Sequence, residues 1–364
     1  MSEAADAPSV DVTRPRWPGP GTGLMILLGL ALATIALAGL TAIGSLIGPI
    51  FLALTLAITA RPAITWLRAH RVPSALSTIL VLLGMYAVAA AMVFAVTVAV
   101  SSLINTLPTY QNEFNALYEG AIEWLQGRGV SADQIATAAK KIDITSLIGI
   151  VPGILGGVSA ASTQLLTLLL ALAFLILDTA DVTKRAAQLR SVKPQLAAAL
   201  EDFTWRVRRY WVVSTIFGLM SASLDFVALL ILRVPMPFTW ALLAFVANYI
   251  PNIGFVIALV PVALLGLLSG GVSTAVWVIV AYCLINVLVQ TVIQPRFIGN
   301  AVGLGTTLTF ISLIFWAGII GPLGAVLAVP LTLFFKAVIV GSSPDLKWLE
   351  IFLQSGDDPP KARA

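Results

Sequence analysis

The sequence Asn248-Tyr249-Ile250-Pro251-Asn252-Ile253-Gly254 interrupts a long apolar run. It places two helix breakers, Pro251 and Gly254, and two carboxamides, Asn248 and Asn252, where the flanking residues are apolar. Hydrocarbon cannot satisfy the backbone groups that a broken helix frees, so a break at membrane depth is tolerated only where protein packs around it or a wet cavity adjoins it. We therefore expect Asn248, Pro251, Asn252 and Gly254 to contact a bound substrate.

The composition predicts a membrane protein. Of the 364 residues, 59% are hydrophobic and only 10% are charged, with a mean hydropathy of +0.98. Soluble domains carry about 25% charged residues. Several runs reach the roughly 20 apolar residues that a spanning helix needs, and no strong alternating pattern indicates a membrane β-barrel. We predict an all-α, polytopic membrane protein.

Few residues suit catalysis or metal binding. The one cysteine, Cys283, lies in an apolar run and the one histidine, His70, lies in a basic loop, whereas a metal site needs several ligands. We expect no catalytic residue, no metal, no cofactor and no enzymatic activity. The basic residues lie in short loops beside apolar helices, where they indicate membrane orientation rather than binding to nucleic acid.

The apolar runs predict about eight membrane segments, including two broken or re-entrant hairpins. The first two helices should meet at a turn marked by Gly44, Gly48 and Pro49, and the second should end at Arg61-Pro62. The loop after the second helix and the segment before residue 210 are rich in basic residues, which predicts that these two segments lie in the cytoplasm. The same orientation places both termini in the cytoplasm. The expected segments are a disordered cytoplasmic tail (1–23), N-terminal membrane helices (24–104), an extracytoplasmic amphipathic segment (105–155), a membrane helix (156–178), a cytoplasmic amphipathic segment (179–209), a C-terminal unit with two interrupted hairpins (210–340) and a cytoplasmic tail (341–364).

The second interruption resembles the first. When the segments that start at Gly254 and Gly324 are aligned with a gap of one residue, both contain Gly-x-Val-apolar-Ala followed by Val-Pro. Each would belong to a unit of one straight span and one broken hairpin, and the two units would form an inverted repeat. Secondary transporters with this pattern bind substrate where the breaks meet, so Gly321, Pro322 and Gly324 join the expected substrate-binding residues. The hairpins could be re-entrant or cross the membrane fully.

Three motifs in order resemble those of the autoinducer-2 exporter (AI-2E) family of bacterial inner-membrane proteins. They are the stretch from Asn248 to Gly254, Gln294-Pro295-Arg296-Phe297-Ile298-Gly299, and the run from Gly318 through Pro330-Leu331, accompanied by Pro49, Pro62 and Arg209-Tyr210. The resemblance implies a homo-oligomeric permease of the bacterial inner membrane. Family members are linked to export of the signalling molecule autoinducer-2, and others to sodium/proton antiport, so membership does not define the substrate.

Asp225 is the only acidic residue well inside a predicted span. A carboxylate there costs roughly 2.5 to 3.5 kcal/mol on insertion scales, and such residues usually face a cavity or a partner and relay protons. We therefore predict that Asp225 couples transport to an ion. The alternatives are a structural pair with Arg233, two helical turns on, and a contact between subunits.

Four carboxamides suit a polar, uncharged ligand or a partly dehydrated cation. Asn248 and Asn252 lie at the break, where they could instead cap the helix ends by bonding nearby backbone groups. Asn286 and Gln290 lie one turn apart on the next span. They could complete the site or bond one helix to another.

These observations predict an exporter of a small polar solute, such as an autoinducer-2-like signalling molecule, that works by ion-coupled alternating access. The alternatives are a sodium/proton antiporter and a membrane scaffold that transports nothing. The sequence contains no Gly-x-x-x-x-Gly-Lys-Ser/Thr loop that would indicate a nucleotide-driven motor. The expected partners are a small-molecule or ion substrate, membrane lipid and further copies of the chain.

Overall fold

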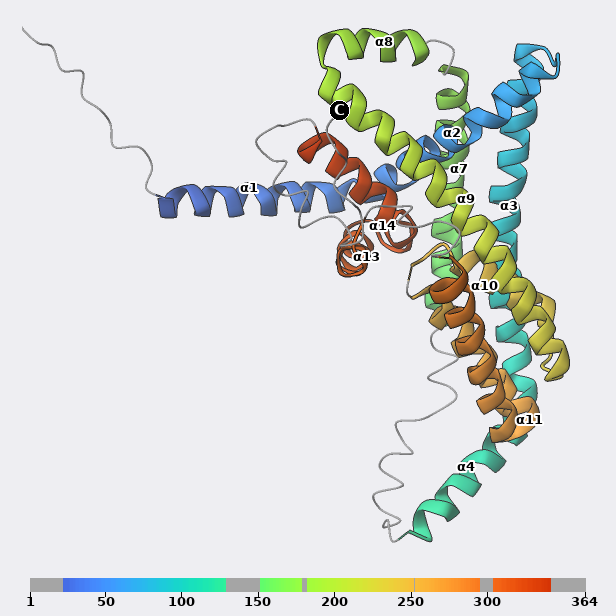
Figure 1. Ribbon diagram of the computed structural model, residues 1–364. Coiled ribbons are helices and arrows are strands. Elements are labelled where there is room, and N and C mark those ends of the chain that lie inside the picture. Colours follow the sequence, from blue (N-terminus) through green and yellow to red (C-terminus); the bar gives the residue numbers. More distant parts are fainter. Residues whose placement is uncertain (1–21, 129–150, 179–181, 252, 295–303, 342–364) are drawn as a thin grey trace, which may run out of the picture. The chain divides into compact units, whose positions relative to one another are not determined.

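The computed structural model describes residues 22–128, 151–178, 182–251, 253–294 and 304–341. Over these ranges the chain forms helices joined by turns and contains no strand, which confirms the all-α prediction (Figure 1). Six helices are long and apolar enough to cross a membrane, or seven if one bent pair is a single span. The expected number of eight is therefore not confirmed.

The chain divides into two compact units, one ending at Ile43 and the other beginning at Gly44. The first unit contains α1 (Thr22–Ala42), an apolar helix of 21 residues with neither an acidic first turn nor a basic last turn. At 1.5 Å per residue it is about 30 Å long, which matches the hydrocarbon thickness of a bilayer.

The second unit begins with α2 (Gly44–Ala69) and α3 (Ser74–Thr106). The first two helices do separate beside Gly44, since α1 ends at Ala42 and α2 begins at Gly44. The turn does not extend to Pro49, and the expected helix end at Pro62 was wrong, because α2 continues through both prolines. Pro62 has no N–H to donate to the carbonyl of Ile58 one turn earlier. That carbonyl instead accepts a hydrogen bond of 3.4 Å from Nη2 of Arg208.

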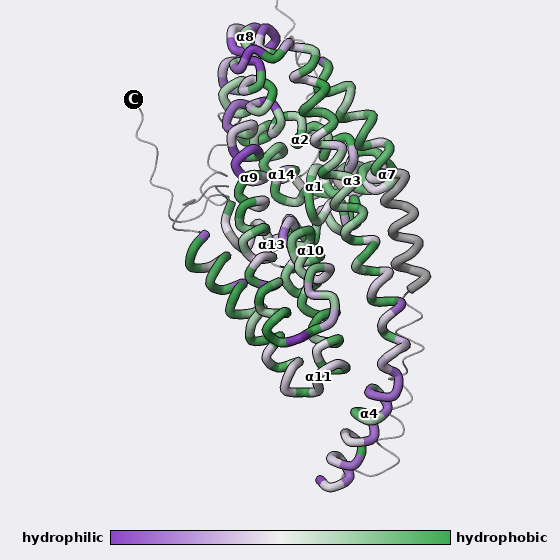
Figure 2. The backbone as a smooth tube through the Cα atoms, turned by 90° about the vertical axis from the view of Figure 1, so that its right-hand side faces the viewer, coloured by the Kyte–Doolittle hydropathy of each residue, from purple (hydrophilic) through white to green (hydrophobic). Residues whose placement is uncertain are grey.

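Polar residues concentrate in the connecting helices of this unit. After η1 (Leu107–Tyr110) come the amphipathic α4 (Gln111–Gln126), the apolar α7 (Val151–Leu177) and the basic α8 (Val182–Val192). Figure 2 shows hydrophilic residues on α4, on α8 and at the start of α9, and apolar residues along the longer helices. Residues 129–150 of the expected amphipathic segment lie outside the described residues.

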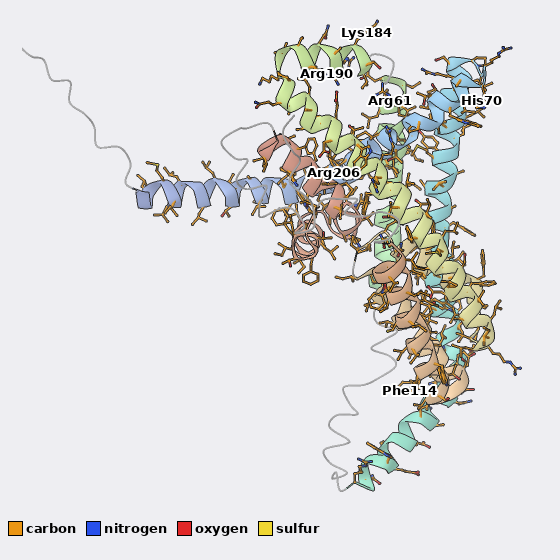
Figure 3. The ribbon with its side chains drawn as sticks, viewed as in Figure 1. Arg61, His70, Phe114, Lys184, Arg190 and Arg206 are labelled. Carbon is orange, nitrogen blue, oxygen red and sulfur yellow. The ribbon has the colours of Figure 1, made fainter. Side chains whose placement is uncertain are left out.

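Helix α9 (Pro194–Ile231) continues without a break across residues 209 and 210, where two segments were expected to meet. Its start and α8 lie at the same end of the unit as the basic end of α2, because Nη2 of Arg61 donates to Oγ1 of Thr183 at 2.8 Å. Figure 3 shows Arg61, Lys184 and Arg190 near that end and Phe114 of α4 at the other. The two basic segments expected on one side of the membrane are thus neighbours.

Two helical hairpins follow α9. The first consists of α10 (Pro237–Ala247) and the start of α11 (Gly254–Asn286); the second consists of α13 (Thr306–Ile320) and α14 (Pro322–Phe335). Short π-helical segments, η3 (Val287–Ile293) and η4 (Lys336–Val340), continue α11 and α14. With 11 residues, α10 is about 16 Å long, about half of the hydrocarbon thickness.

Helix α11 is in fact two half-helices that meet at Gly271. This glycine has φ +72° and ψ −173°, which turns the chain. The half-helices pack together, since a Cβ at Gly266 would lie 3.2 Å from a methyl group of Val278. The second half, with η3, is therefore the straight span expected between the two hairpins.

Candidate functional site

The break in the first hairpin is held by backbone hydrogen bonds and by one close contact. The N–H of Ile250 donates to Ala247 O at 2.9 Å, and that of Gly254 donates to Ile250 O at 3.0 Å. A Cβ on Gly254 would overlap the carbonyl oxygen of Ala247, so this position requires glycine. Pro251 is partly exposed beside it, and Asn252 lies outside the described residues.

The break in the second hairpin has the same close contact. Gly321 has φ +80° and ψ −153°, and Pro322 starts α14 at a position that tolerates proline. A Cβ on Gly324 would overlap the carbonyl oxygen of Trp316, in the preceding helix of the hairpin. Gly254 and Gly324 are the residues that the sequence repeat aligns, and both bring the second helix of a hairpin against a carbonyl of the first.

The straight spans of the two repeat units run antiparallel. Phe217 of α9 shares a small hydrophobic core with Val289 of η3. Asp225, further along α9, borders the same cavity as Tyr282, which precedes Val289. Residue numbers thus rise along one span as they fall along the other, and this supports the expected inverted repeat.

A hydrogen-bonded chain of polar groups crosses these spans at the first break. Nε2 of Gln290 donates to Oδ1 of Asn248 at 2.9 Å, and Nδ2 of Asn248 donates to the carbonyl of Ser214 at 3.2 Å. Gly218 makes room for this carboxamide, since a Cβ there would lie 2.8 Å from Nδ2 of Asn248. The bonds of Asn248 therefore link three helices rather than cap one.

A small polar cavity of about 20 Å³ adjoins this chain of groups. It brings together four of the predicted site residues, Asp225, Asn248, Asn286 and Gln290, with no contribution from Gly321, Pro322 or Gly324. The full lining is Ser221, Asp225, Ala244, Asn248, Phe255, Ala258, Tyr282, Ile285, Asn286 and Gln290. Among the ion pairs of the described residues, none joins Asp225 to Arg233.

A second cavity, of about 700 Å³, lies between the hairpins and helices α2, α3, α7 and α9. Tyr249 borders it beside the first break, and Leu323 borders it beside the second. Its lining is mainly apolar. The polar side chains at its wall include Gln164, Thr215 and Tyr249, and the last two share a hydrogen bond of 2.8 Å. Both breaks thus adjoin one ligand-sized cavity, but the predicted carboxamides gather beside the first break only.

Sequence reasoning missed several residues of this site, although a periodic signal was present. Ser214, Gly218, Ser221 and Asp225 recur on one face of α9 at spacings of three and four residues. Tyr282 precedes Asn286 by four residues, as Asn286 precedes Gln290. Gln290 lies in the π-helical η3, and such segments are frequent at functional sites.

The part of the chain that the structure describes contains no metal site of the usual kind. No three side chains of His, Cys, Asp or Glu lie close enough there to hold a metal ion. The polar groups of the two cavities are hydroxyls, carboxamides, indole and one carboxyl. Such groups bind by hydrogen bonding or to hard cations.

Broken hairpins beside a ligand-sized cavity, in a chain of apolar helices, define a multi-pass membrane transporter. The sequence model described as "AI-2E family transporter" matches residues 24–341. The chain belongs to this family, as its motifs predicted.

Relatives across bacteria bear similar names. The chain is 32% identical to the AI-2 transport protein TqsA of Escherichia coli over 320 residues, which cover 87% of this chain and 92% of TqsA. It is 28% identical to the putative transport protein YhhT of the same species over 312 residues, 85% of this chain and 89% of YhhT. A putative transport protein of Haemophilus influenzae is 28% identical over 324 residues, 88% of this chain and 93% of that protein.

Proposed function

We propose that this transporter exports a small, uncharged polar solute of the autoinducer-2 class by ion-coupled alternating access. The observation that carries the proposal is the pair of cavities at the hairpin breaks. One is large enough for an organic solute and borders both breaks; the other is small, polar and contains Asp225. The printed name of TqsA supports the choice of solute.

The large cavity suits a solute that has an apolar face and a few hydrogen-bonding groups. Ligand pockets typically have volumes of about 300–1,000 Å³ and mainly apolar walls with few polar groups, and this cavity has about 700 Å³. Trp211 borders it, and the buried indole N–H of Trp211 has no hydrogen-bond partner among the described residues.

Rocking of the hairpins would open this cavity to alternate sides of the membrane. Both hairpins end in breaks beside the cavity, through Tyr249 and Leu323. Inverted repeats support such motion, because the two repeat units can exchange their conformations and so convert an inward-open protein into an outward-open one. Asn248, Pro251, Asn252 and Gly254 in the first hairpin, and Gly321, Pro322 and Gly324 in the second, would form the moving ends.

Sodium/proton antiport is the second candidate, and the buried carboxyl of Asp225 favours it. Asp225→Asn should abolish antiport but should spare export that needs no ion. Purified protein in liposomes should release trapped autoinducer-2 at a rate that depends on a sodium or proton gradient. Release by the Asp225→Asn variant should no longer depend on that gradient. Absence of any flux from correctly folded, reconstituted protein would contradict both transport proposals and favour a scaffold.

We also propose a bacterial inner-membrane location, cytoplasmic termini and assembly into a homo-oligomer. The basic residues of α8 and of the α2 end support the orientation, because positively charged segments stay in the cytoplasm. Light scattering of the purified protein in detergent would measure the number of subunits, and a monomeric mass with transport activity would contradict the oligomer.

A further inference from the structure

Three buried polar atoms around the small cavity have no hydrogen-bond partner within the described residues. They are Oγ of Ser221 and Oδ1 of Asp225 on α9 and the hydroxyl of Tyr282 on α11. Asp225 is only 4% exposed and Tyr282 only 3%. Buried polar groups are nearly always bonded, because leaving them without a partner costs free energy. Three such atoms at one cavity indicate a ligand that they share.

Ser221 differs from the other hydroxyl residues of its helix. Oγ1 of Thr215 donates to the carbonyl of Trp211 at 2.7 Å, and Oγ of Ser223 donates to that of Leu219 at 2.8 Å. This local bond is the usual one for Ser and Thr within helices. Ser221 lines the small cavity and makes no such bond in the structure, so its buried oxygen still lacks a partner.

The size of the cavity restricts its ligand to a single small particle. A volume of about 10–15 Å³ is needed for one water molecule, and this cavity has about 20 Å³. An organic solute does not fit. The small cavity is therefore an ion or water site, distinct from the solute cavity of about 700 Å³.

The chemistry of the lining selects a monovalent cation. The small cavity is bordered by one carboxyl, two hydroxyls and the carboxamides of Asn248, Asn286 and Gln290, and by no basic side chain. The amide nitrogen of Gln290 is bonded to Asn248, which leaves its oxygen. Oxygen ligands suit hard cations, and one carboxylate balances one positive charge. A buried carboxylate without a counter-charge would be unfavourable.

Resting on the ion-coupled transport proposed above, we infer that the small cavity binds one dehydrated sodium ion through Ser221, Asp225, Tyr282 and Asn286. Tyr282 is the only titratable lining residue besides Asp225. The lining residues that α10, the start of α11 and η3 contribute carry no titratable group.

The chain of hydrogen bonds from Gln290 connects this site to the first hairpin. Gln290 lines the cavity and holds Asn248 at the hairpin break, and Asn248 in turn holds the backbone of α9 at Ser214. An ion that reorders the cavity would shift Gln290 and thus the hairpin. This is the physical connection that coupling between ion and solute requires.

The test is sodium binding by the purified full-length protein in lipid nanodiscs. Binding of radioactive sodium should saturate at one ion per chain, because the cavity has room for a single small ion. Asp225→Asn should abolish saturable binding. Ser221→Ala, Tyr282→Phe and Asn286→Ala should each weaken it about tenfold or more.

Ser223→Ala provides the matched control, because Ser223 lies on the same helix but is exposed and bonded to its own backbone. Its affinity for sodium should stay within about twofold of that of the unchanged protein. Saturable binding that survives in Asp225→Asn, or no binding by folded protein at any pH, would overturn the inference and leave the cavity as a water site. Size-exclusion profiles would verify folding of each variant.

Failure of the sodium site and failure of the proposed function give different results. Solute release without sodium binding would reject the sodium site alone. Sodium binding without solute release would uphold the site and reject solute export. Sodium binding with sodium/proton exchange would support the site in an antiporter.

Discussion

The side-chain amide of Gln290 donates a hydrogen bond of 2.9 Å to Oδ1 of Asn248, and so joins η3 to the break of the first hairpin. The two residues are 42 positions apart in the chain. Neither their sequence separation nor their residue types predicts the pairing, which depends on the antiparallel arrangement of α9 and the end of α11.

This bond should appear as energetic coupling between the two residues. We expect Asn248→Ala and Gln290→Ala each to destabilise the protein, and the double variant to lose about 1 kcal/mol less than the sum of the two, since each variant removes the same bond. Denaturant unfolding in mixed micelles measures this coupling. Strictly additive effects would show that the bond contributes nothing.

Gly218 should tolerate no larger residue. Gly218→Ala places a Cβ 2.8 Å from Nδ2 of Asn248, so we expect a lower melting temperature and loss of transport, with a cost of about 1–3 kcal/mol for overpacking. Gly318→Ala is the control, because a Cβ there meets nothing within 4 Å. That variant should be neutral or slightly more stable, since alanine favours helix.

The two repeat glycines should be equally intolerant of substitution. In Gly254→Ala and Gly324→Ala the new methyl group overlaps a carbonyl oxygen of the preceding helix. We expect each to cost about 1–3 kcal/mol or more, measured as reduced melting temperature of the solubilised protein. If one tolerates alanine and the other does not, the hairpins are not equivalent in packing.

Narrowing the large cavity should impair solute flux while sparing sodium binding. Val326 borders this cavity and Val260 does not; Val260 is exposed on α11. Val326→Phe should therefore reduce release of autoinducer-2 from liposomes and leave sodium affinity within about twofold, whereas Val260→Phe should change neither. Normal flux through Val326→Phe protein would place the solute route elsewhere.

The orientation can be tested by labelling single cysteines. Replacing Cys283, the one native cysteine, by serine provides the background. Cysteine introduced at the exposed His70 should react with membrane-impermeant maleimide only after cells are broken, and cysteine at Gln126 should react in intact spheroplasts. The opposite result would reverse the proposed topology.

Much of the fold follows from local features of the sequence. Apolar length predicts membrane helices. A proline paired with a nearby glycine, Pro251 with Gly254 and Gly321 with Pro322, predicts the two hairpin breaks, and the helices do end and restart at both places. The prediction failed at Pro62, where α2 continues and the carbonyl that the proline leaves unbonded accepts a hydrogen bond from another helix. The donor, Arg208, lies 150 positions away.

The sequence by itself determined the class of the protein, its breaks and most of the polar residues near them, because composition, helix breaking and charge are local properties. Only the tertiary structure decided which of these residues share a cavity. It gathers Asp225, Asn248, Asn286 and Gln290 with the unpredicted Ser221 and Tyr282, and it leaves Gly321, Pro322 and Gly324 to packing in the second hairpin. The physical reason is that the antiparallel packing of α9 and the end of α11 sets which helix faces meet, and no local pattern in either helix specifies that contact.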